Sequence, residues 1–150
     1  MTDLRVLDPA AAAAELAGSS EAARGFLGLD PVTQNEPLLA AELTRMSAGV
    51  CRADGGALVG FAPSPGQPRQ MLLASTSARP EPVRALLGFL RAYCRYSSCL
   101  AMVPAGNASA EAYESCRFTR IGTLRGHWYQ SGEYRDVTVY FAKAADACQS

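Results

Sequence analysis

The sequence predicts a mixed α/β fold, also described as α+β, in which helices flank a central sheet that contains hairpins. Three observations lead to this expectation. Hydrophobic residues make up 49% of the 150 residues, which is enough to bury an ordinary core. Helical and strand patterns follow one another along the chain, and the turn signals Asp54-Gly55 and Ser131-Gly132 each separate two strand patterns. We therefore expect a single domain over residues 1–150.

The first third of the chain is predicted to be mostly helical. Residues 4–6 alternate between apolar and polar side chains, as in a short strand. Asp8 is placed to cap a helix that has Pro9 in its first turn and continues to about residue 17. Two further helices are expected over residues 20–27 and 37–46.

Strands and helices alternate in the rest of the chain. The stretch GVCRA, the turn DGG and the stretch ALVGFAPS form a hairpin pattern. RQMLLASTSA follows as a strand whose centre is apolar on both faces, as in a buried central strand. From Val83 to Tyr96 the apolar side chains recur at helical spacing. CLAMV is the next expected strand, ASAEAYESC a short helix, and two strands form a closing hairpin.

Composition narrows the classes of function. Fourteen basic and fourteen acidic residues cancel, so no overall field attracts nucleic acid or an anionic membrane. No stretch is long and apolar enough to span a bilayer. The cysteines at positions 51, 94, 99, 116 and 148 are odd in number and form no C-x-x-C motif, and the charged start MTDLRVLD differs from a signal peptide. We expect a reduced, cytoplasmic protein without a metal site.

The stretch PAGNASAEAYESCRFTRIGTLRGHWYQSGEYRDVTVYFA resembles the GNAT superfamily of N-acetyltransferases. The shared features are a strand end, an Asn, a short helix with a Tyr, a Phe and a final hairpin. FLGLDPVTQNEPLLAAEL and DGGALVGFAP resemble the first half of such proteins more weakly. The resemblance implies a GNAT-like fold with a mostly antiparallel mixed sheet. It also implies that Asn107 contacts the pantetheine arm of the acyl donor and that Tyr113 protonates the departing thiolate.

The same two residues have simpler structural interpretations. Asn107 is an ordinary N-cap for a helix that begins at Ala108. Tyr113 fits an aromatic residue at the edge of a core.

The loop that would hold the pyrophosphate of CoA departs from the superfamily pattern Gln/Arg-x-x-Gly-x-Gly/Ala. The three pattern positions fall on Ala78, Glu81 and Val83. Pro80 and Pro82 remove two backbone donors, and Glu81 places a carboxylate where phosphates would lie. The alternative to a phosphate site is a proline-stiffened turn whose acidic residue favours the helix N-terminus.

Some residues could compensate for these departures. Hydroxyl groups at residues 75–77 can donate to phosphate, and two nearby arginines can pair with it. The resemblance also implies that the pantetheine arm pairs with the edge of the central strand. The candidate residues for binding acetyl-CoA or another pantetheine thioester are therefore Leu73, Ala74, Ser75, Ser77, Arg79, Arg84 and Asn107.

The closing hairpin holds the only histidine and the only tryptophan of the chain. With Ser131-Gly132 as the turn, Trp128 faces Arg135 and His127 faces Asp136. Asp136 could then orient the imidazole of His127, which would serve as the base that the central strand lacks. The alternative is that Asp136 only ties the two strands of a surface hairpin together.

The two faces of this hairpin differ in character. The face with Trp128, Val137 and Phe141 is apolar, and we expect it to lie on the core. The face with His127 and Tyr140 is aromatic with polar tips, and it could line a substrate groove.

The leading interpretation is an acyltransferase that moves an acetyl or other acyl group from a CoA or pantetheine thioester to an amine. Tyr113 is the expected acid, and His127 with Asp136, or a water molecule, is the expected base; Glu36 and Glu42 are further candidates. The acceptor would be a small-molecule or peptide amine, and an acyl carrier protein or a second copy of the chain are candidate partners. The alternative is a GNAT-fold protein that has lost CoA and binds a ligand or partner, or catalyses a different reaction in the same cleft.

Overall fold

The structure is a computed structural model that describes residues 3–147. Its strands are β1 Leu4–Leu7, β2 Gly49–Ala53, β3 Leu58–Ser64, β4 Gln67–Ser75, β5 Ser98–Pro104, β6 Thr119–Gln130 and β7 Glu133–Lys143. Its helices are α1 Pro9–Ser19, α2 Glu36–Arg45, α3 Pro80–Tyr93, α4 Ser109–Ser115 and α5 Ala144–Ala147, with short 3-10 turns at η1 Ser20–Ala23 and η2 Phe26–Gly28.

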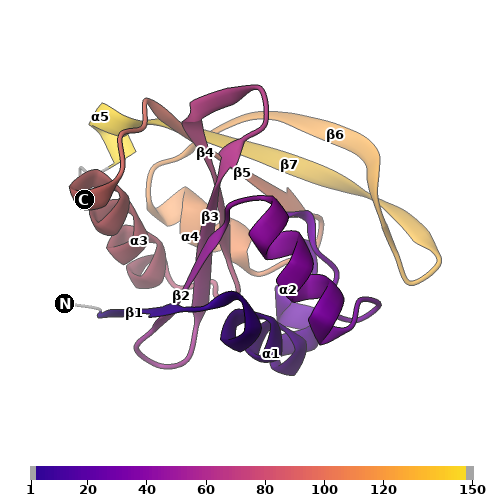
Figure 1. Cartoon of the computed structure of the whole chain (residues 1–150). Coiled ribbons are helices and arrows are strands. Elements are labelled where there is room, and N and C mark those ends of the chain that lie inside the picture. Colours follow the sequence, from indigo (N-terminus) through magenta and orange to yellow (C-terminus); the bar gives the residue numbers. More distant parts are fainter. Residues whose placement is uncertain (1–2, 148–150) are drawn as a thin grey trace.

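The strands form a seven-stranded sheet in the order β1-β2-β3-β4-β5-β7-β6 (Figure 1). Neighbouring strands are antiparallel except β4 and β5, which are parallel. The predicted mixed α/β class with a mostly antiparallel sheet is therefore confirmed. No helix among residues 3–147 has the length and apolar character that crossing a membrane requires.

Two helices of the first third begin where local side chains favour a start. The Oδ1 atom of Asp8 accepts a hydrogen bond from the Ala11 N–H at 2.8 Å, at the start of α1. The Oδ1 atom of Asn35 accepts one from the Leu38 N–H at 3.0 Å and caps α2. Each of these bonds satisfies a backbone donor that the first helical turn leaves free. The predicted helices over residues 9–17 and 37–46 are thus present.

The predicted helix over residues 20–27 is wrong. Two separate turns, η1 and η2, replace it because Gly25 adopts a left-handed conformation with a φ of 84°. A Cβ atom at this position would lie 2.6 Å from Cγ of Pro104 at the end of β5. Gly25 therefore allows segment 20–35 to cross closely over the end of β5.

Helix α3 begins and ends earlier than predicted. It starts at Pro80 rather than Val83 and ends at Tyr93 rather than Tyr96. A proline fits the first position of a helix because the N–H that it lacks would have no intrahelical partner there. The predicted buried face is present and includes Val83, Leu86, Leu87 and Leu90.

The sheet separates two apolar cores. Alternate residues of each strand point to opposite faces, so Val50 packs with α1 and α2, whereas Cys51 packs with α3 and α4. Leu73 and Ala74 divide in the same way. Among the described residues, the core on the side of α1 and α2 includes strand residues of β1 to β4, whereas the core on the other side also includes residues of β5 and β7.

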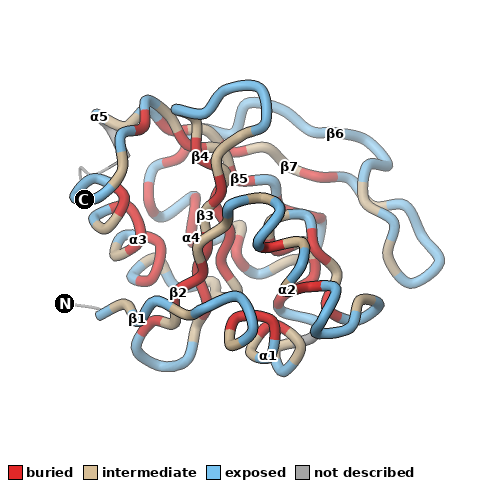
Figure 2. Tube along the Cα trace, viewed as in Figure 1, coloured by how far each residue is buried: buried red, intermediate tan, exposed pale blue. Residues whose placement is uncertain are grey.

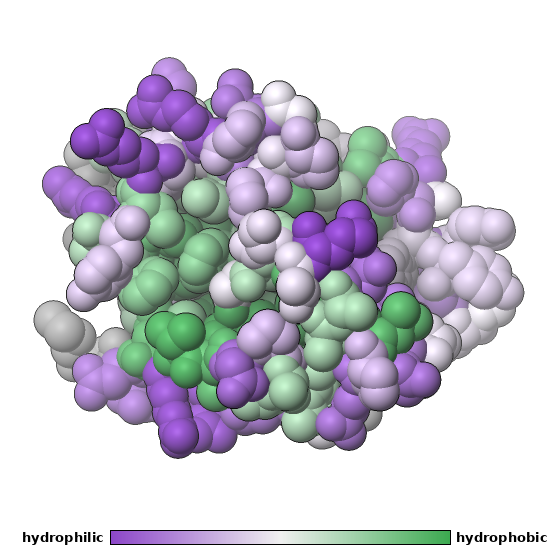
Figure 3. Space-filling view, viewed as in Figure 1, coloured by the Kyte–Doolittle hydropathy of each residue, from purple (hydrophilic) through white to green (hydrophobic). Residues whose placement is uncertain are grey.

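Strand β6 forms one edge of the sheet and is exposed over nearly its whole length. Figure 2 shows it as a pale blue strand beside β7, whose second half contains buried and half-buried residues. On the face seen in Figure 3, apolar residues (green) gather toward the side of α3, with hydrophilic residues (purple) around them.

Candidate functional site

A small cavity, here called the slot, lies where β4 and β5 separate. Their parallel pairing ends at Leu73 and Ala101. Beyond this point Ala74 and Ser75 pair with β3, and the end of β5 pairs with β7. The slot lies between the diverging strands and has a volume of about 10 Å³, enough for about one water molecule. The edge of β4 that faces β5 is therefore without a strand partner at residues 74 and 75.

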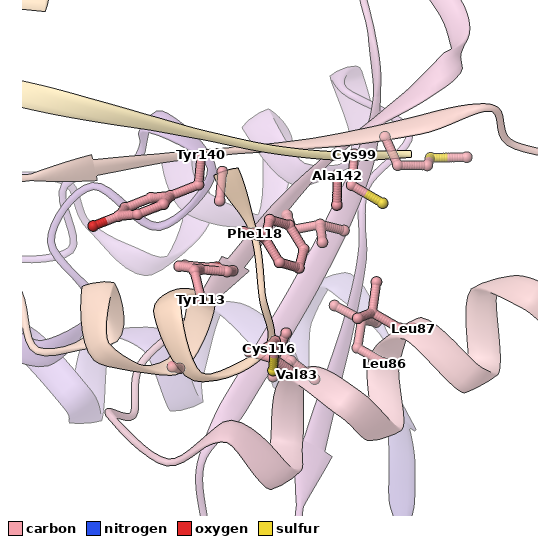
Figure 4. Packing of buried hydrophobic residues seen from close by; sticks show 14 of the residues in the cluster. Val83, Leu86, Leu87, Cys99, Tyr113, Cys116, Phe118, Tyr140 and Ala142 are labelled. Carbon is pink, nitrogen blue, oxygen red and sulfur yellow. The ribbon is translucent and has the colours of Figure 1, made fainter. Parts of the chain in front are cut away.

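Tyr113 of α4 lines the slot. Its side chain is 1% exposed, and its ring packs 5.3 Å from that of Phe118 and 5.8 Å from that of Tyr140 (Figure 4). None of the hydrogen bonds within residues 3–147 uses the Tyr113 hydroxyl. Burial, with a smaller effect of the nearby Cys116 and Cys99 thiols, raises the pKa of Tyr113. The phenol consequently keeps its proton at neutral pH.

Asn107 also lines the slot and organises the loop before α4. Its Oδ1 atom accepts a hydrogen bond from the Ser109 N–H at 2.9 Å, and its Nδ2 atom donates to the Arg24 carbonyl at 3.3 Å. The helix begins at Ser109, one residue after the expected start at Ala108. Asn107 therefore links the start of α4 to segment 20–35, and its contact with a thioester stays a prediction.

A larger cavity, here called the apolar pocket, opens on the other face of the sheet. Its volume is about 390 Å³. Leu72, Leu100 and Val137 line it, and they alternate with the residues that pack around Tyr113. The apolar pocket and the slot share four lining residues, Gly25, Leu73, Met102 and Pro104. The two cavities therefore meet between β4 and β5.

The predicted pairing of His127 with Asp136 is wrong. Trp128 lies opposite Arg135 as expected, but the register then shifts, and Leu124 lies opposite Val137. Residues 125–127 form a bulge opposite Asp136 alone. The Oδ1 atom of Asp136 accepts a hydrogen bond from the Gly126 N–H at 2.9 Å, where Gly126 has a φ of 56°. Asp136 thus holds the bulge rather than the imidazole.

His127 is exposed at the bulge and lines the apolar pocket together with Trp128. No hydrogen bond of its ring occurs within the part of the chain that the structure describes. The bulge, rather than a carboxylate, therefore brings His127 to the pocket.

The expected orientation of the closing hairpin is wrong for one of its faces. Val137 is buried, as expected, although it lines the apolar pocket, and Phe141 is half-buried. Tyr140, which was expected at a substrate groove, is 1% exposed and stacks on Tyr113 in the core. The physical reason is coverage, because the core of α1 and α2 reaches β4 and does not include β5 or β7. The apolar face of the hairpin consequently faces the pocket.

Solved structures that resemble this chain include N-acetyltransferases. Spermidine N-acetyltransferase from Vibrio cholerae, in complex with CoA and spermine, matches 97% of both chains with a TM-score of 0.72 and 14% identity. A ribosomal L7/L12 α-N-protein acetyltransferase in complex with coenzyme A matches 95% of this chain and 93% of its own, with a TM-score of 0.68 and 16% identity. A putative acetyltransferase from Salmonella typhimurium with acetyl-CoA covers 95% and 94%, with a TM-score of 0.66 and 16% identity. The chain has the GNAT fold.

The predicted GNAT-like fold is thereby confirmed, and at this level of identity the likeness concerns the fold alone. No family model matches the sequence, and no curated protein matches it either.

Arg24, which the sequence interpretation missed, holds the segment that passes over the slot. The buried guanidinium of Arg24 contacts Asp30 through two bonds, Nε to Oδ1 at 3.1 Å and Nη2 to Oδ2 at 3.2 Å. Its Nη1 atom donates to the Ser131 hydroxyl at 3.0 Å, at the tip of the closing hairpin. Asp30 raises the pKa of Arg24 through these hydrogen bonds. Arg24 fixes the segment that carries Gly25 over the slot and the pocket.

The loop from β4 to α3 largely binds its own backbone. The Ser75 hydroxyl accepts a hydrogen bond from the Ser77 N–H at 3.2 Å, and the Ser77 hydroxyl accepts one from the Arg79 N–H at 3.0 Å. The side chain of Arg79 lies 3.8 Å from Glu81 and is 60% exposed. Arg84 is exposed one turn further along α3. The two arginines are accessible to a phosphate, whereas both serine hydroxyls already have backbone partners.

The other acidic candidates do not lie at the apolar pocket. Glu42 forms an ion pair with Arg45 on α2 at 2.6 Å, and Glu36 is exposed at the start of the same helix. Neither residue lines the slot or the pocket. Within residues 3–147, no group of three or more His, Cys, Asp or Glu side chains could hold a metal ion. Cys148 lies outside the described residues.

Proposed function

We propose that this chain is an N-acyltransferase that moves an acetyl or other acyl group from a CoA or pantetheine thioester to an amine. The observation that carries this proposal is the slot between β4 and β5. Tyr113 lines it from the side of α4, and the apolar pocket adjoins it on the other face of the sheet. The fold supports the proposal, because structures that share it were solved with CoA or acetyl-CoA.

The chain would hold the thioester chiefly through the edge of β4. Amide groups of the pantetheine arm can pair with the backbone of Ala74 and Ser75, next to Leu73, at which the pairing with β5 ends; all three residues face the slot. Asn107 would position the arm from the start of α4. We propose that phosphate binding is weak, with Arg79, Arg84 and Ser77 as its candidate ligands, because the hydroxyl of Ser77 and its neighbours already pair within the loop.

The bound thioester supplies an acyl carbon to which the amine nitrogen forms a bond while the carbon–sulfur bond breaks, so the products are an amide and a free thiol. Tyr113 is the proposed acid, because its phenol lines the slot in which the thioester sulfur would lie and can donate its proton to the departing sulfur. His127 or a water molecule in the pocket would accept the proton that the amine loses. Asp136 has no proposed chemical role, because it bonds to the bulge.

Titration calorimetry with acetyl-CoA and with acetyl-pantetheine tests the donor. We expect both to bind, with affinities within about tenfold of each other, because the pantetheine arm makes most of the proposed contacts. Failure of both compounds to bind at about millimolar concentration would refute the proposal. A much larger advantage for acetyl-CoA would show that the loop from β4 to α3 does hold the pyrophosphate.

Substitution Tyr113→Phe tests the acid. We expect turnover to fall by about a hundredfold, because a positioned general acid contributes at least that factor. Binding of the thioester should change little, since the ring and its packing remain. Tyr134→Phe is the matched control, because Tyr134 is 72% exposed near the hairpin tip. Equal turnover of Tyr113→Phe and the unsubstituted chain would remove Tyr113 from the mechanism.

A further inference from the structure

The walls of the apolar pocket limit which amine it can accept. Apolar side chains line most of it, among them Leu27, Leu72, Leu100, Met102 and Val137. Among residues 3–147, no carboxylate lines it, and the only ionisable side chain that lines it is that of His127. A ligand with several ammonium groups would lose hydration in this pocket without gaining a paired charge.

The acidic residues closest to the pocket in the chain are already engaged. Asp30 bonds to the buried Arg24 next to Gly25 and Leu27. Asp136 bonds to the backbone of Gly126 beside His127. Asp30 is thus paired with a cation, Asp136 uses one oxygen to hold the bulge, and neither carboxylate lines the pocket.

The apolar floor continues from the pocket along the sheet. Cross-strand neighbours on this face are Leu100 with Phe141, Met102 with Val139, and Val137 with Leu124. Met102 is 39% exposed and Leu124 is 38% exposed. An acceptor that is larger than the pocket would consequently also contact apolar side chains outside it.

Trp128 adds an aromatic surface to this wall. Its indole Nε1 atom donates a hydrogen bond to Gln130 Oε1 at 3.0 Å, which fixes the ring at the pocket. Aromatic rings favour offset or edge-to-face contacts with one another. The wall therefore suits a ligand that carries a ring.

We propose that the apolar pocket binds an aromatic monoamine, a molecule with one amino group on an aromatic body, and excludes polyamines. That this amine is the acyl acceptor rests on the proposed function above. The proposal sets this chain apart from the Vibrio cholerae enzyme of the same fold, which was solved with spermine.

Fluorescence of Trp128 tests binding without acyl transfer, because Trp128 is the only tryptophan of the chain and lines the pocket. The probes are 2-phenylethylamine and 1,5-diaminopentane, which have similar lengths and differ in the second charge. We expect 2-phenylethylamine to change the fluorescence with a Kd at least about tenfold lower than that of the diamine. Equal or tighter binding of 1,5-diaminopentane, or no response to 2-phenylethylamine, would overturn the proposal.

Substitution Met102→Glu sharpens the test by adding a carboxylate to the pocket. We expect it to reduce the preference for 2-phenylethylamine by up to about fivefold, because the diamine gains a partner for its second charge at a partly exposed position. Ile121→Glu is the matched control, since Ile121 is 56% exposed on β6 and does not line the pocket. An unchanged preference in Met102→Glu, or the same change in Ile121→Glu, would contradict the assignment of this pocket.

Release of thiol from acetyl-CoA with each amine separates the two proposals. Selective binding of 2-phenylethylamine, with no thiol released from acetyl-CoA in the presence of either amine, would support the pocket assignment and refute the proposed acyl transfer. Thiol release with 1,5-diaminopentane but not with 2-phenylethylamine would support acyl transfer and overturn the assignment of the acceptor.

Discussion

At the scale of single residues, Arg24 connects three parts of the chain that are distant in sequence. Its guanidinium binds Asp30, its Nη1 atom binds the Ser131 hydroxyl, and its carbonyl accepts from Asn107. The side chain of Arg24 is 6% exposed and that of Asp30 is 14% exposed. Loss of one partner would leave the other charged and poorly hydrated, which costs more than the loss of a surface pair.

We expect Arg24→Ala to lower the free energy of unfolding by about 3 kcal/mol, because it leaves the Asp30 carboxylate without its partner. Urea unfolding measures the difference. Arg45→Ala is the control, because Arg45 is 68% exposed and pairs with Glu42 within one helix. Its expected cost is much smaller, because an exposed ion pair contributes little to stability. Similar losses in both variants would contradict the structural role of Arg24.

A second residue-scale prediction concerns Glu114, which joins α4 to the last two strands. Tyr140 donates its hydroxyl proton to Glu114 Oε2 at 2.6 Å, and Arg120 Nη2 donates to the same atom at 2.8 Å. These hydrogen bonds, that of Tyr140 first, lower the pKa of Glu114 from its ordinary value of 4.5. Ionised Glu114 therefore stabilises the folded state above about pH 4.5, and this contribution is lost as the pH falls through the lower pKa of the folded state.

Substitution Glu114→Gln tests this dependence on pH. We expect the difference in unfolding free energy from the unsubstituted chain to be largest near about pH 7 and to shrink toward about pH 3. Urea unfolding over this range measures it, with Glu111→Gln on the same exposed side of α4 as the control. A constant difference across the range would show that ionisation of Glu114 does not contribute.

At the scale of elements, the register of the closing hairpin determines which of its residues line the apolar pocket. Its turn is formed by Ser131 and Gly132, both with positive φ, as the two-residue turn predicts. The pairs next to the turn were predictable, because turn type fixes the register of the first residues. The bulge at residues 125–127 was not, since the glycine at position 126 and the acid at position 136 form no pattern that sequence spacing identifies.

The role of Asp136 in the bulge can be tested with two variants. Asp136→Ala removes the acceptor of the Gly126 N–H, and we expect it to lower the unfolding free energy by about 0.5–1 kcal/mol and to change Trp128 fluorescence. Asp136→Asn keeps an oxygen at Oδ1 and should preserve both properties. Equal effects of the two variants would show that the charge matters rather than the acceptor.

At the scale of the whole molecule, the site arises from unequal coverage of the sheet. The core of α3 and α4 includes Tyr113 and Tyr140, whereas the core of α1 and α2 includes strand residues no further along the sheet than β4. Figure 1 shows the hairpin of β6 and β7 extending beyond the helices. The face of β5 and β7 that α1 and α2 leave open becomes the floor of the apolar pocket.

The sequence by itself determined the classes of element and most of their limits, because periodicity, caps and turn signals act over a few residues. It determined the order of elements along the chain, namely β4, α3, β5, α4 and the closing hairpin. This order led to the expectation of a GNAT-like fold. Tyr113 and Asn107 could be selected because they lie within one short local pattern, and the structure places both at the slot.

Only the tertiary structure decided which face of the hairpin is buried, where β4 and β5 separate, and which charges meet. Helix coverage places Tyr140 in the core and Val137 at the pocket, although both lie on one strand with clear alternation. The contact of Arg24 with Ser131 joins residues 107 positions apart, and no local pattern encodes it. Such contacts depend on how the elements pack in three dimensions, so the pocket and its apolar lining follow from the tertiary structure alone.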